Sequence, residues 1–341
     1  MAASDARENP HLGERDEAAM PHRFGTIRGL QQCASPRGTF TMLALDHRQN
    51  LRRELRPDDP GSVTTDDMVA FKRAVVRAIG GAGTGVLLDP EIGAAQSIAD
   101  GSLPGGVGLV VALEATGYLG DSTARVSRLL EGWDAEGVRR LGASAAKLLV
   151  YYHPDAPNAA DQERFVADVA ASCRALDLAL FLEPLGFSLR EGERLTGSER
   201  RRVVLETARR LTALGGDVLK AEFPYDAGET DESLWRDACE ELTAAIGVPW
   251  VLLSGGVDAD TFEAQVRVAC SAGASGVLAG RSIWAEAATM GPRERDAFLA
   301  GTARRRLSEL TAIVDGLARP WMDAAPSLEA TDPLPEDWYR A

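Results

Sequence analysis

Short apolar segments alternate with longer amphipathic segments along the chain from about residue 39 onward. Eight of the short segments have the length and composition of buried strands: "TFTMLALD", "GVLLD", "GLVVALE", "AAKLLVYY", "ALFLEPL", "DVLKAEF", "WVLLSGG" and "GVLAGR". Apolar residues in the longer segments recur every three or four positions, as in "DQERFVADVAASCRAL", "SERRRVVLETARRLTAL" and "DADTFEAQVRVACSAG", which is typical of helices with one buried face. Eight strands alternating with helices over roughly 280 residues predict a single-domain α/β fold, the (β/α)8 TIM barrel. A doubly wound open sheet is the alternative, but it more naturally stops at about five to seven strands.

The predicted barrel occupies residues 25–320, between two segments of different composition. Residues 1–24 are polar, and we expect a flexible leader there. Residues 321–341 are rich in proline and acidic residues and are interpreted as a C-terminal tail. The stretch "GGAGTG" at residues 80–85 follows a predicted helix and precedes a predicted strand. A phosphate-binding loop requires the reverse order, so we interpret this stretch as a helix stop and turn.

Four of the predicted strands interrupt their apolar pattern with a charged residue: Asp46, Lys147, Glu183 and Lys220. Inward side chains of a parallel barrel are buried, and charged residues near the C-terminal ends of the strands usually form the active site. In "DVLKAEFP", the period of two also places Lys220 and Glu222 on one face. A buried salt-bridge network would explain any one of the four charges alone. Four such charges on separate strands favour chemistry.

Two lysines and two carboxylates suit catalysis by a covalent imine. A lysine nucleophile must be neutral to attack a carbonyl, and a second ammonium group nearby favours the neutral form, while carboxylates move the protons. The four histidines, His11, His22, His47 and His153, are too few and too scattered for a multi-histidine metal site. We therefore expect neither a metal nor a cofactor.

The last two predicted strands lead into an expected anion site. Small residues in "LLSGGVD" (Ser254, Gly255 and Gly256) leave backbone N–H groups free for a phosphate, and "LAGRS" adds Gly280 and Arg281. The loops after the seventh and eighth strands are the usual phosphate site of this fold, and an arginine adds a charge-assisted hydrogen bond. The alternative is a pair of tight turns with a surface arginine.

Composition excludes several other classes of protein. The chain has 341 residues, 45% of them hydrophobic, and a formal net charge of −14, which argues against binding to nucleic acid or to an anionic membrane surface. It contains neither an apolar run near the ~20 residues that span a bilayer nor a secretory signal at its start. The four cysteines lack CxxC spacing and are expected to be reduced, buried thiols. We expect a cytoplasmic homo-oligomer that acts on a small sugar phosphate.

Between about Thr39 and Glu286 the sequence resembles the class I tagatose 1,6-bisphosphate aldolases and the related sulfofructosephosphate aldolases. The motifs that carry this resemblance occur in family order: "LALDHR", "LLDPEIG", "LEATGY", "KLLVYYHPD", "FLEPL", "DVLKAEFP", "LLSGGV" and "GVLAGRSIW". The resemblance implies that Lys220 is the Schiff-base lysine and Glu183 the principal proton-transfer residue. It also implies that Lys147 and Asp46 are polar partners at the substrate carbonyl and hydroxyls. The phosphate of dihydroxyacetone phosphate would bind at Ser254, Gly255, Gly256, Gly280 and Arg281.

The segment after the first predicted strand departs from the family pattern at one position. The family more often has Gln where this chain has His47, whose parity puts it off the face that Asp46 occupies. We therefore expect His47 to support the site from behind and Arg48 to meet a distal anionic group of the substrate. Four residues after the second and third strands could bind sugar hydroxyls or cap loops: Asp89, Glu91, Glu114 and Tyr118.

The sequence thus predicts a metal-independent class I aldolase. It would reversibly cleave a ketose 1-phosphate with a second anionic group, of the tagatose 1,6-bisphosphate or 6-deoxy-6-sulfofructose 1-phosphate type, to dihydroxyacetone phosphate and an aldehyde. The alternatives are a transaldolase-like transfer through the same imine, a non-catalytic sugar-phosphate sensor and a metal-dependent aldolase. The scarce histidines disfavour the last of these.

Overall fold

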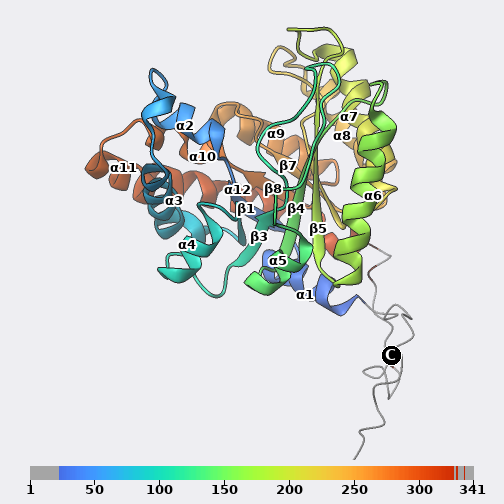
Figure 1. The fold of residues 1–341 in the computed structure, drawn as a ribbon. Helices are drawn as coiled ribbons and strands as arrows, with labels where there is room; N and C mark the ends of the chain where they lie inside the picture. The colour runs from blue at the N-terminus through green and yellow to red at the C-terminus, as the bar shows by residue number, and fades with distance from the viewer. Residues whose placement is uncertain (1–22, 326–327, 329–333, 335–341) are drawn as a thin grey trace, which may run out of the picture.

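The computed structural model describes residues 23–325, 328 and 334. Eight parallel strands close into a barrel in chain order, with β1 paired to both β2 and β8 (Figure 1). The strands are β1 (Phe40–Leu45), β2 (Gly85–Leu88), β3 (Gly108–Ala112), β4 (Ala145–Tyr152), β5 (Ala179–Gly186), β6 (Val218–Ala221), β7 (Trp250–Leu253) and β8 (Gly276–Ala279). The predicted barrel and all eight predicted strands are confirmed, and the open-sheet alternative is wrong.

Helices surround the barrel and connect its strands (Figure 1). They are α1 (Phe24–Cys33), α2 (Gln49–Leu55), α3 (Thr65–Ile79), α4 (Ala94–Ala99), α5 (Ala135–Leu141), α6 (Ala159–Ala175), α7 (Gly197–Thr212), α8 (Glu232–Ala245), α9 (Ala259–Ser271), α10 (Arg281–Trp284), α11 (Pro292–Phe298) and α12 (Arg304–Leu317). Helix α3 begins at a capping box between Thr64 and Asp67, which satisfies two free backbone N–H groups. It ends at Ile79 before a short 3-10 turn (Gly80–Ala82), so "GGAGTG" is the helix stop that the sequence predicts.

The N-terminal end of the barrel is filled by a compact apolar cluster. Phe40 and Phe181 meet edge to face with their ring centroids 5.9 Å apart, and α1 packs beneath them through Leu30. Trp321, at the start of the expected tail, is buried in the same cluster. Strand β8 approaches β1 so closely that a Cβ at Gly276 would lie 1.9 Å from the Phe40 carbonyl oxygen. Only glycine fits there.

One wall at the C-terminal end is taller than the rest of the rim. Strands β4 and β5 pair along eight residues each and rise above their neighbours (Figure 1). The segment between β3 and α5 folds as a ribbon, with isolated antiparallel bridges at Glu114 to Leu129 and Leu119 to Val126. The Arg125 guanidinium lies 4.6 Å from the centre of the Tyr118 ring, a cation–π contact that fastens the ribbon.

Two further predictions concern the cysteines and membrane-spanning helices. All four cysteines are buried and free of disulfides, as predicted, and burial raises the pKa of Cys270 to about 12. Within the described part of the chain, no helix has the length and hydropathy needed to cross a bilayer. The expected leader falls almost wholly outside the described residues, and so does most of the expected tail.

Candidate active site

A cavity of about 690 Å³ opens at the C-terminal ends of the strands, where the fold places active sites. Three of the four charged strand residues line it: Asp46, Glu183 and Lys220. The fourth, Lys147, lies just behind the wall, with 1% of its side chain exposed. The structure therefore brings all four predicted charges to one place.

The Lys147 ammonium is enclosed by three carboxylates. Its Nζ atom lies 2.8 Å from an oxygen of Asp46, of Glu114 and of Glu183. Burial alone would lower the pKa of Lys147, but the three negative charges hold that pKa well above its ordinary value. Lys147 is therefore a fixed cation.

Asp46 is held as an anion by the same contacts. Burial would raise the pKa of its carboxyl group, but Lys147 and Lys220 keep that pKa well below the usual range. Asp46 directly follows β1, so its position depends on where that strand ends.

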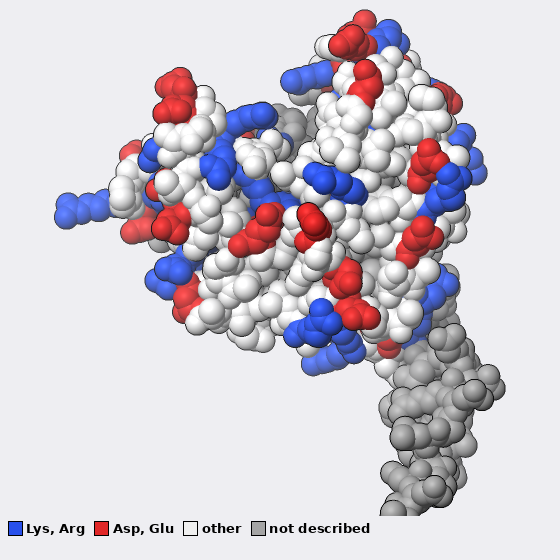
Figure 2. All heavy atoms as spheres, viewed as in Figure 1, with Lys and Arg blue, Asp and Glu red and all other residues white. Residues whose placement is uncertain are grey.

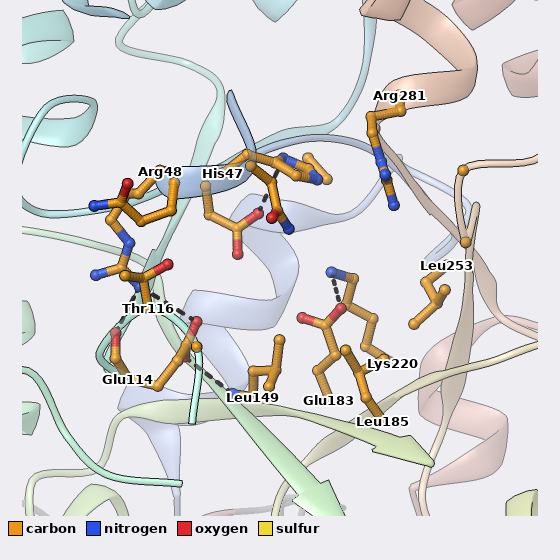
Figure 3. A pocket seen from close by; sticks show the side chains of 18 of the residues that line it. His47, Arg48, Glu114, Thr116, Leu149, Glu183, Leu185, Lys220, Leu253 and Arg281 are labelled. Carbon is orange, nitrogen blue, oxygen red and sulfur yellow. Dashed lines mark hydrogen bonds and ion pairs between the residues drawn. The ribbon is translucent and has the colours of Figure 1, made fainter. Parts of the chain in front are cut away.

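Lys220 and Glu183 point toward one another across the cavity floor (Figure 3). The Lys220 Nζ atom lies 2.7 Å from Glu183 Oε1, and the other oxygen of the same carboxylate contacts Lys147. Glu183 thus joins the two lysines, and of the two lysines only Lys220 lines the cavity. A ligand in the cavity can therefore contact Lys220 but not Lys147.

Glu222 also lines the cavity, as expected from its spacing to Lys220. Its carboxylate, however, accepts a hydrogen bond from the Gly186 backbone N–H at 2.7 Å and pairs with Arg200 of α7 at 3.1 Å. These contacts tie the end of β6 to β5 and α7. The Glu222 carboxylate is therefore already engaged by contacts within the barrel wall.

The loops after β7 and β8 meet at the predicted anion site. The Gly280 backbone N–H donates to Ser254 Oγ at 3.3 Å, which joins the two loops. Gly255 and Gly256 both have positive φ angles, 58° and 83°, and a Cβ at Gly256 would lie 2.9 Å from an Arg281 nitrogen. Glycine therefore allows the Arg281 guanidinium to lie along the loop, where an anion could contact both.

His47 lines the cavity from the first loop, so the expectation that it supports the site from behind is wrong. Its ring packs edge to face on Trp284, with centroids 5.3 Å apart. Burial lowers its pKa to about 4, against the opposing pull of Asp46, and Arg281 lowers it further. His47 is therefore neutral near pH 7. Its Nδ1 atom, 3.8 Å from an Asp46 oxygen, is buried without a hydrogen-bond partner.

Arg48 is buried at the opposite side of the cavity from Arg281 (Figure 3). It donates to the Glu91 carboxylate and to the Glu114 backbone carbonyl, each at 2.7 Å. Arg48 thereby connects the loops that follow β2 and β3.

Two charged residues, Glu114 and Lys72, make structural contacts that the sequence does not predict. Glu114 contacts Lys147 and also accepts the Leu149 backbone N–H at 3.0 Å. Lys72 of α3 forms a fully buried ion pair with Asp89, whose other oxygen caps the loop after β2. The feature of the sequence that could have identified Lys72 is its position on the apolar face of the helix, beside Phe71 and Val75.

The remaining loop residues differ in how they face the cavity. Glu114 and Tyr118 line it, whereas Asp89 and Glu91 do not and are paired with Lys72 and Arg48. Among the residues that the structure describes, no three His, Cys, Asp or Glu side chains are grouped so as to hold a metal ion.

Comparison with known proteins identifies the family. The profile of the DeoC/LacD family aldolases matches residues 40–286, which include all eight strands and the whole cavity floor. The chain belongs to the DeoC/LacD aldolase family. It is therefore an aldolase. The resemblance found in the sequence is confirmed.

Relatives within this family carry more specific names. The tagatose 1,6-diphosphate aldolase of Listeria monocytogenes is 28% identical over 332 residues, covering 89% of this chain and 96% of the relative. Tagatose 1,6-diphosphate aldolase 2 of Streptococcus pyogenes is 27% identical over 309 residues, covering 84% and 94%.

Solved structures of lower identity share the barrel of this DeoC/LacD aldolase. A fructose-bisphosphate aldolase from Slackia heliotrinireducens superimposes with a TM-score of 0.61 at 18% identity, covering 85% of this chain and 91% of that one. An archaeal fructose 1,6-bisphosphate aldolase gives a TM-score of 0.57 at 21% identity, covering 86% and 99%. At these identities the likeness concerns the fold.

Proposed function

We propose that this aldolase reversibly cleaves a ketose 1-phosphate with a second anionic group, to dihydroxyacetone phosphate and an aldehyde. The observation that carries the proposal is the contrast between the two lysines. Lys220 faces the cavity beside a single carboxylate, whereas Lys147 is enclosed by three. A ketone in the cavity can reach Lys220 only.

Glu183 is the proton carrier in the proposed reaction. Its Oε1 atom, 2.7 Å from Lys220 Nζ, accepts a proton from the ammonium and so frees the amine lone pair. The amine attacks the ketone carbon to form a carbinolamine. The proton then leaves with the departing hydroxyl as water, and an iminium ion remains on Lys220.

The iminium draws the electron pair of the carbon–carbon bond when the substrate splits. A base removes the proton from the hydroxyl group on the far carbon of that bond, the aldehyde leaves, and the electron pair forms an enamine on Lys220. Glu183 and Asp46 are the proposed acid–base groups at the cavity floor. Protonation and hydrolysis of the enamine release dihydroxyacetone phosphate and restore the amine.

The first phosphate would bind between the loops after β7 and β8. Ser254, Gly255, Gly256 and Gly280 offer small side chains and backbone N–H groups, and Arg281 offers a guanidinium. Arg48 remains the predicted contact for the distal anionic group. The names of the relatives favour tagatose 1,6-bisphosphate as the substrate, and a panel of phosphorylated and sulfonated ketoses assayed for triose phosphate release tests this choice.

Reduction of the imine tests the lysine assignment. Borohydride plus dihydroxyacetone phosphate should inactivate the enzyme and add one triose phosphate per chain on Lys220, located by peptide mapping. Lys220→Ala should abolish trapping and turnover. Lys147→Ala should cripple turnover but leave some trapping at Lys220. An adduct on Lys147, or full turnover without Lys220, would contradict the proposed mechanism.

A further inference from the structure

Among the described residues, four cationic side chains line the cavity of this aldolase, and three of them already have a carboxylate partner. The pairs are Lys220 with Glu183 at 2.7 Å, Arg48 with Glu91 at 2.7 Å and Arg281 with Glu54 at 3.5 Å. The fourth cation is Arg53. Among the residues that the structure describes, no carboxylate lies within the 4.0 Å of an ion pair from it.

Arg53 belongs to the short helix α2, which stands over the cavity after β1. Gln49, Asn50 and Arg53 line the cavity from one side of this helix, because positions four apart lie one above the other. Leu51 faces the core instead. Arg53 is exposed, whereas Lys220 is only 4% exposed. Arg53 therefore lies at the mouth of the cavity and Lys220 at its floor.

We infer that Arg53 binds the anionic group at the end of the substrate remote from the first phosphate. This inference rests on the proposed function, which places the ketone at Lys220 and the first phosphate beside Arg281. The remaining carbons of the sugar must then extend from the floor toward the mouth. A terminal phosphate or sulfonate, a tetrahedral oxyanion in either case, meets the Arg53 guanidinium there.

The pairing of the other cations explains why Arg53 is the effective contact. Arg48 already donates to Glu91 and to the Glu114 carbonyl, so two acceptors share its charge before any ligand arrives. Arg53 breaks no ion pair when it binds an anion, and the full charge-assisted hydrogen bond is gained. Arg48 then supports the distal group as a second cation.

The surface around the cavity agrees with an anionic ligand. The whole chain carries a net charge of −14, yet Lys and Arg side chains gather around the hollow over the barrel on the face drawn in Figure 2. A local cluster of cations on an acidic protein raises the concentration of a doubly charged substrate at the mouth.

Calorimetry with sugar alcohols tests Arg53 apart from catalysis, because a hexitol has no carbonyl and forms no imine. Wild-type protein should bind hexitol 1,6-bisphosphate about tenfold or more tightly than hexitol 1-phosphate. Arg53→Gln should reduce this preference to about twofold or less and leave the affinity for the monophosphate unchanged. Arg53→Lys should retain part of the preference.

Two controls accompany these variants. Arg37→Gln removes the same charge from an exposed position in the turn before β1, at the other end of the barrel, and should alter neither affinity. Arg281→Ala should weaken both ligands. An undiminished preference in Arg53→Gln, or an equal loss for both ligands, would overturn the inference. Failure of the wild type to cleave any ketose phosphate would instead refute the proposed function, since the hexitol comparison does not depend on turnover.

Discussion

At the scale of single residues, the charges of the cavity floor bear on the stability of the proposed iminium ion. Asp46, Glu114 and Glu183 provide three negative charges, whereas Lys147 and Lys220 provide two positive ones. The excess negative charge is buried, where electrostatic interactions are strong. The Lys220 iminium would carry the same positive charge as the ammonium it replaces, so the surrounding carboxylates would stabilise it throughout the proposed reaction.

Glu183→Gln should lower kcat by roughly 10²–10⁴-fold, because the amide keeps the shape of the side chain but cannot accept the proton of Lys220. Steady-state assays of triose phosphate release measure this loss. Asp46→Asn is the comparison variant, since Asp46 contacts Lys147 and not Lys220 in the described ion pairs. Activity of Glu183→Gln within a few-fold of wild type would move the proton-transfer role to Asp46.

His47 should make the folded protein less stable in mild acid. Its pKa of about 4 in the folded state lies below the ordinary value of 6.5 because most of the imidazole is shielded from solvent. The unfolded chain therefore binds the proton first, so the contribution of His47 to stability is present above about pH 6.5 and declines as the pH falls toward 4. Between about pH 7.5 and 5, wild-type protein should lose about 1–2 kcal/mol more free energy of unfolding than His47→Gln.

Urea denaturation of both proteins at the two pH values measures this difference. Because the other acidic and basic groups are common to both proteins, their titration cancels in the comparison. Equal losses in the two proteins would mean that His47 is protonated without cost in the folded state.

The sequence predicts some of these residues and not others for a physical reason. Lys147 and Lys220 stand out because a charge interrupts an apolar strand. Glu114 lies beyond the end of β3, where a polar residue is ordinary, and Lys72 lies on a helix that carries many charges. The roles of Glu114 and Lys72 depend on contacts between residues far apart in the sequence. The local pattern of polar and apolar residues does not show such contacts.

At the scale of elements, the buried pair of Lys72 and Asp89 joins helix α3 to the loop after β2. That loop carries Glu91, which in turn holds Arg48. The helix therefore positions a cavity residue that it does not contact. The period-two and period-3.6 patterns predict such helices and strands well, but they do not predict which elements an ion pair will join.

Lys72→Met should lower the free energy of unfolding by about 3–5 kcal/mol, because it leaves the Asp89 carboxylate buried without its partner. Urea denaturation near pH 7 measures this change. Lys72→Met combined with Asp89→Asn should recover part of the loss, since the amide carries no charge and its oxygen can still accept the loop N–H groups. If the double variant is no more stable than Lys72→Met, the cost arises from packing and not from the unpaired charge.

The same scale explains why the ribbon between β3 and α5 could not be predicted from the sequence. The ribbon between β3 and α5 is held by two isolated bridges and by the stacking of Arg125 on Tyr118. Isolated bridges leave no run of alternating residues, so no strand is predicted there.

At the scale of the whole molecule, the class of chemistry depends on what occupies the centre of the carboxylates. Asp46, Glu114 and Glu183 point at one spot, and the Lys147 ammonium fills it, with its Nζ atom 2.8 Å from each of them. This arrangement favours the proposed covalent amine chemistry.

Activity should therefore survive incubation with EDTA and dialysis into metal-free buffer. The comparison is a parallel sample given Zn²⁺ or Mg²⁺ after chelation, which should show no gain in kcat. Loss of triose phosphate release on chelation, restored by one of these ions, would contradict a metal-independent mechanism.

The apolar cluster at the N-terminal end of the barrel has a consequence for how such a protein can diverge. Phe40, Phe181 and Trp321 fill that end, whereas the cavity is lined from the opposite ends of the strands and the loops that follow. Natural selection can therefore act on the two ends almost independently. A descendant lineage that acquires a new sugar preference is expected to change positions such as Arg53, and to retain the aromatic residues at the N-terminal end of the barrel.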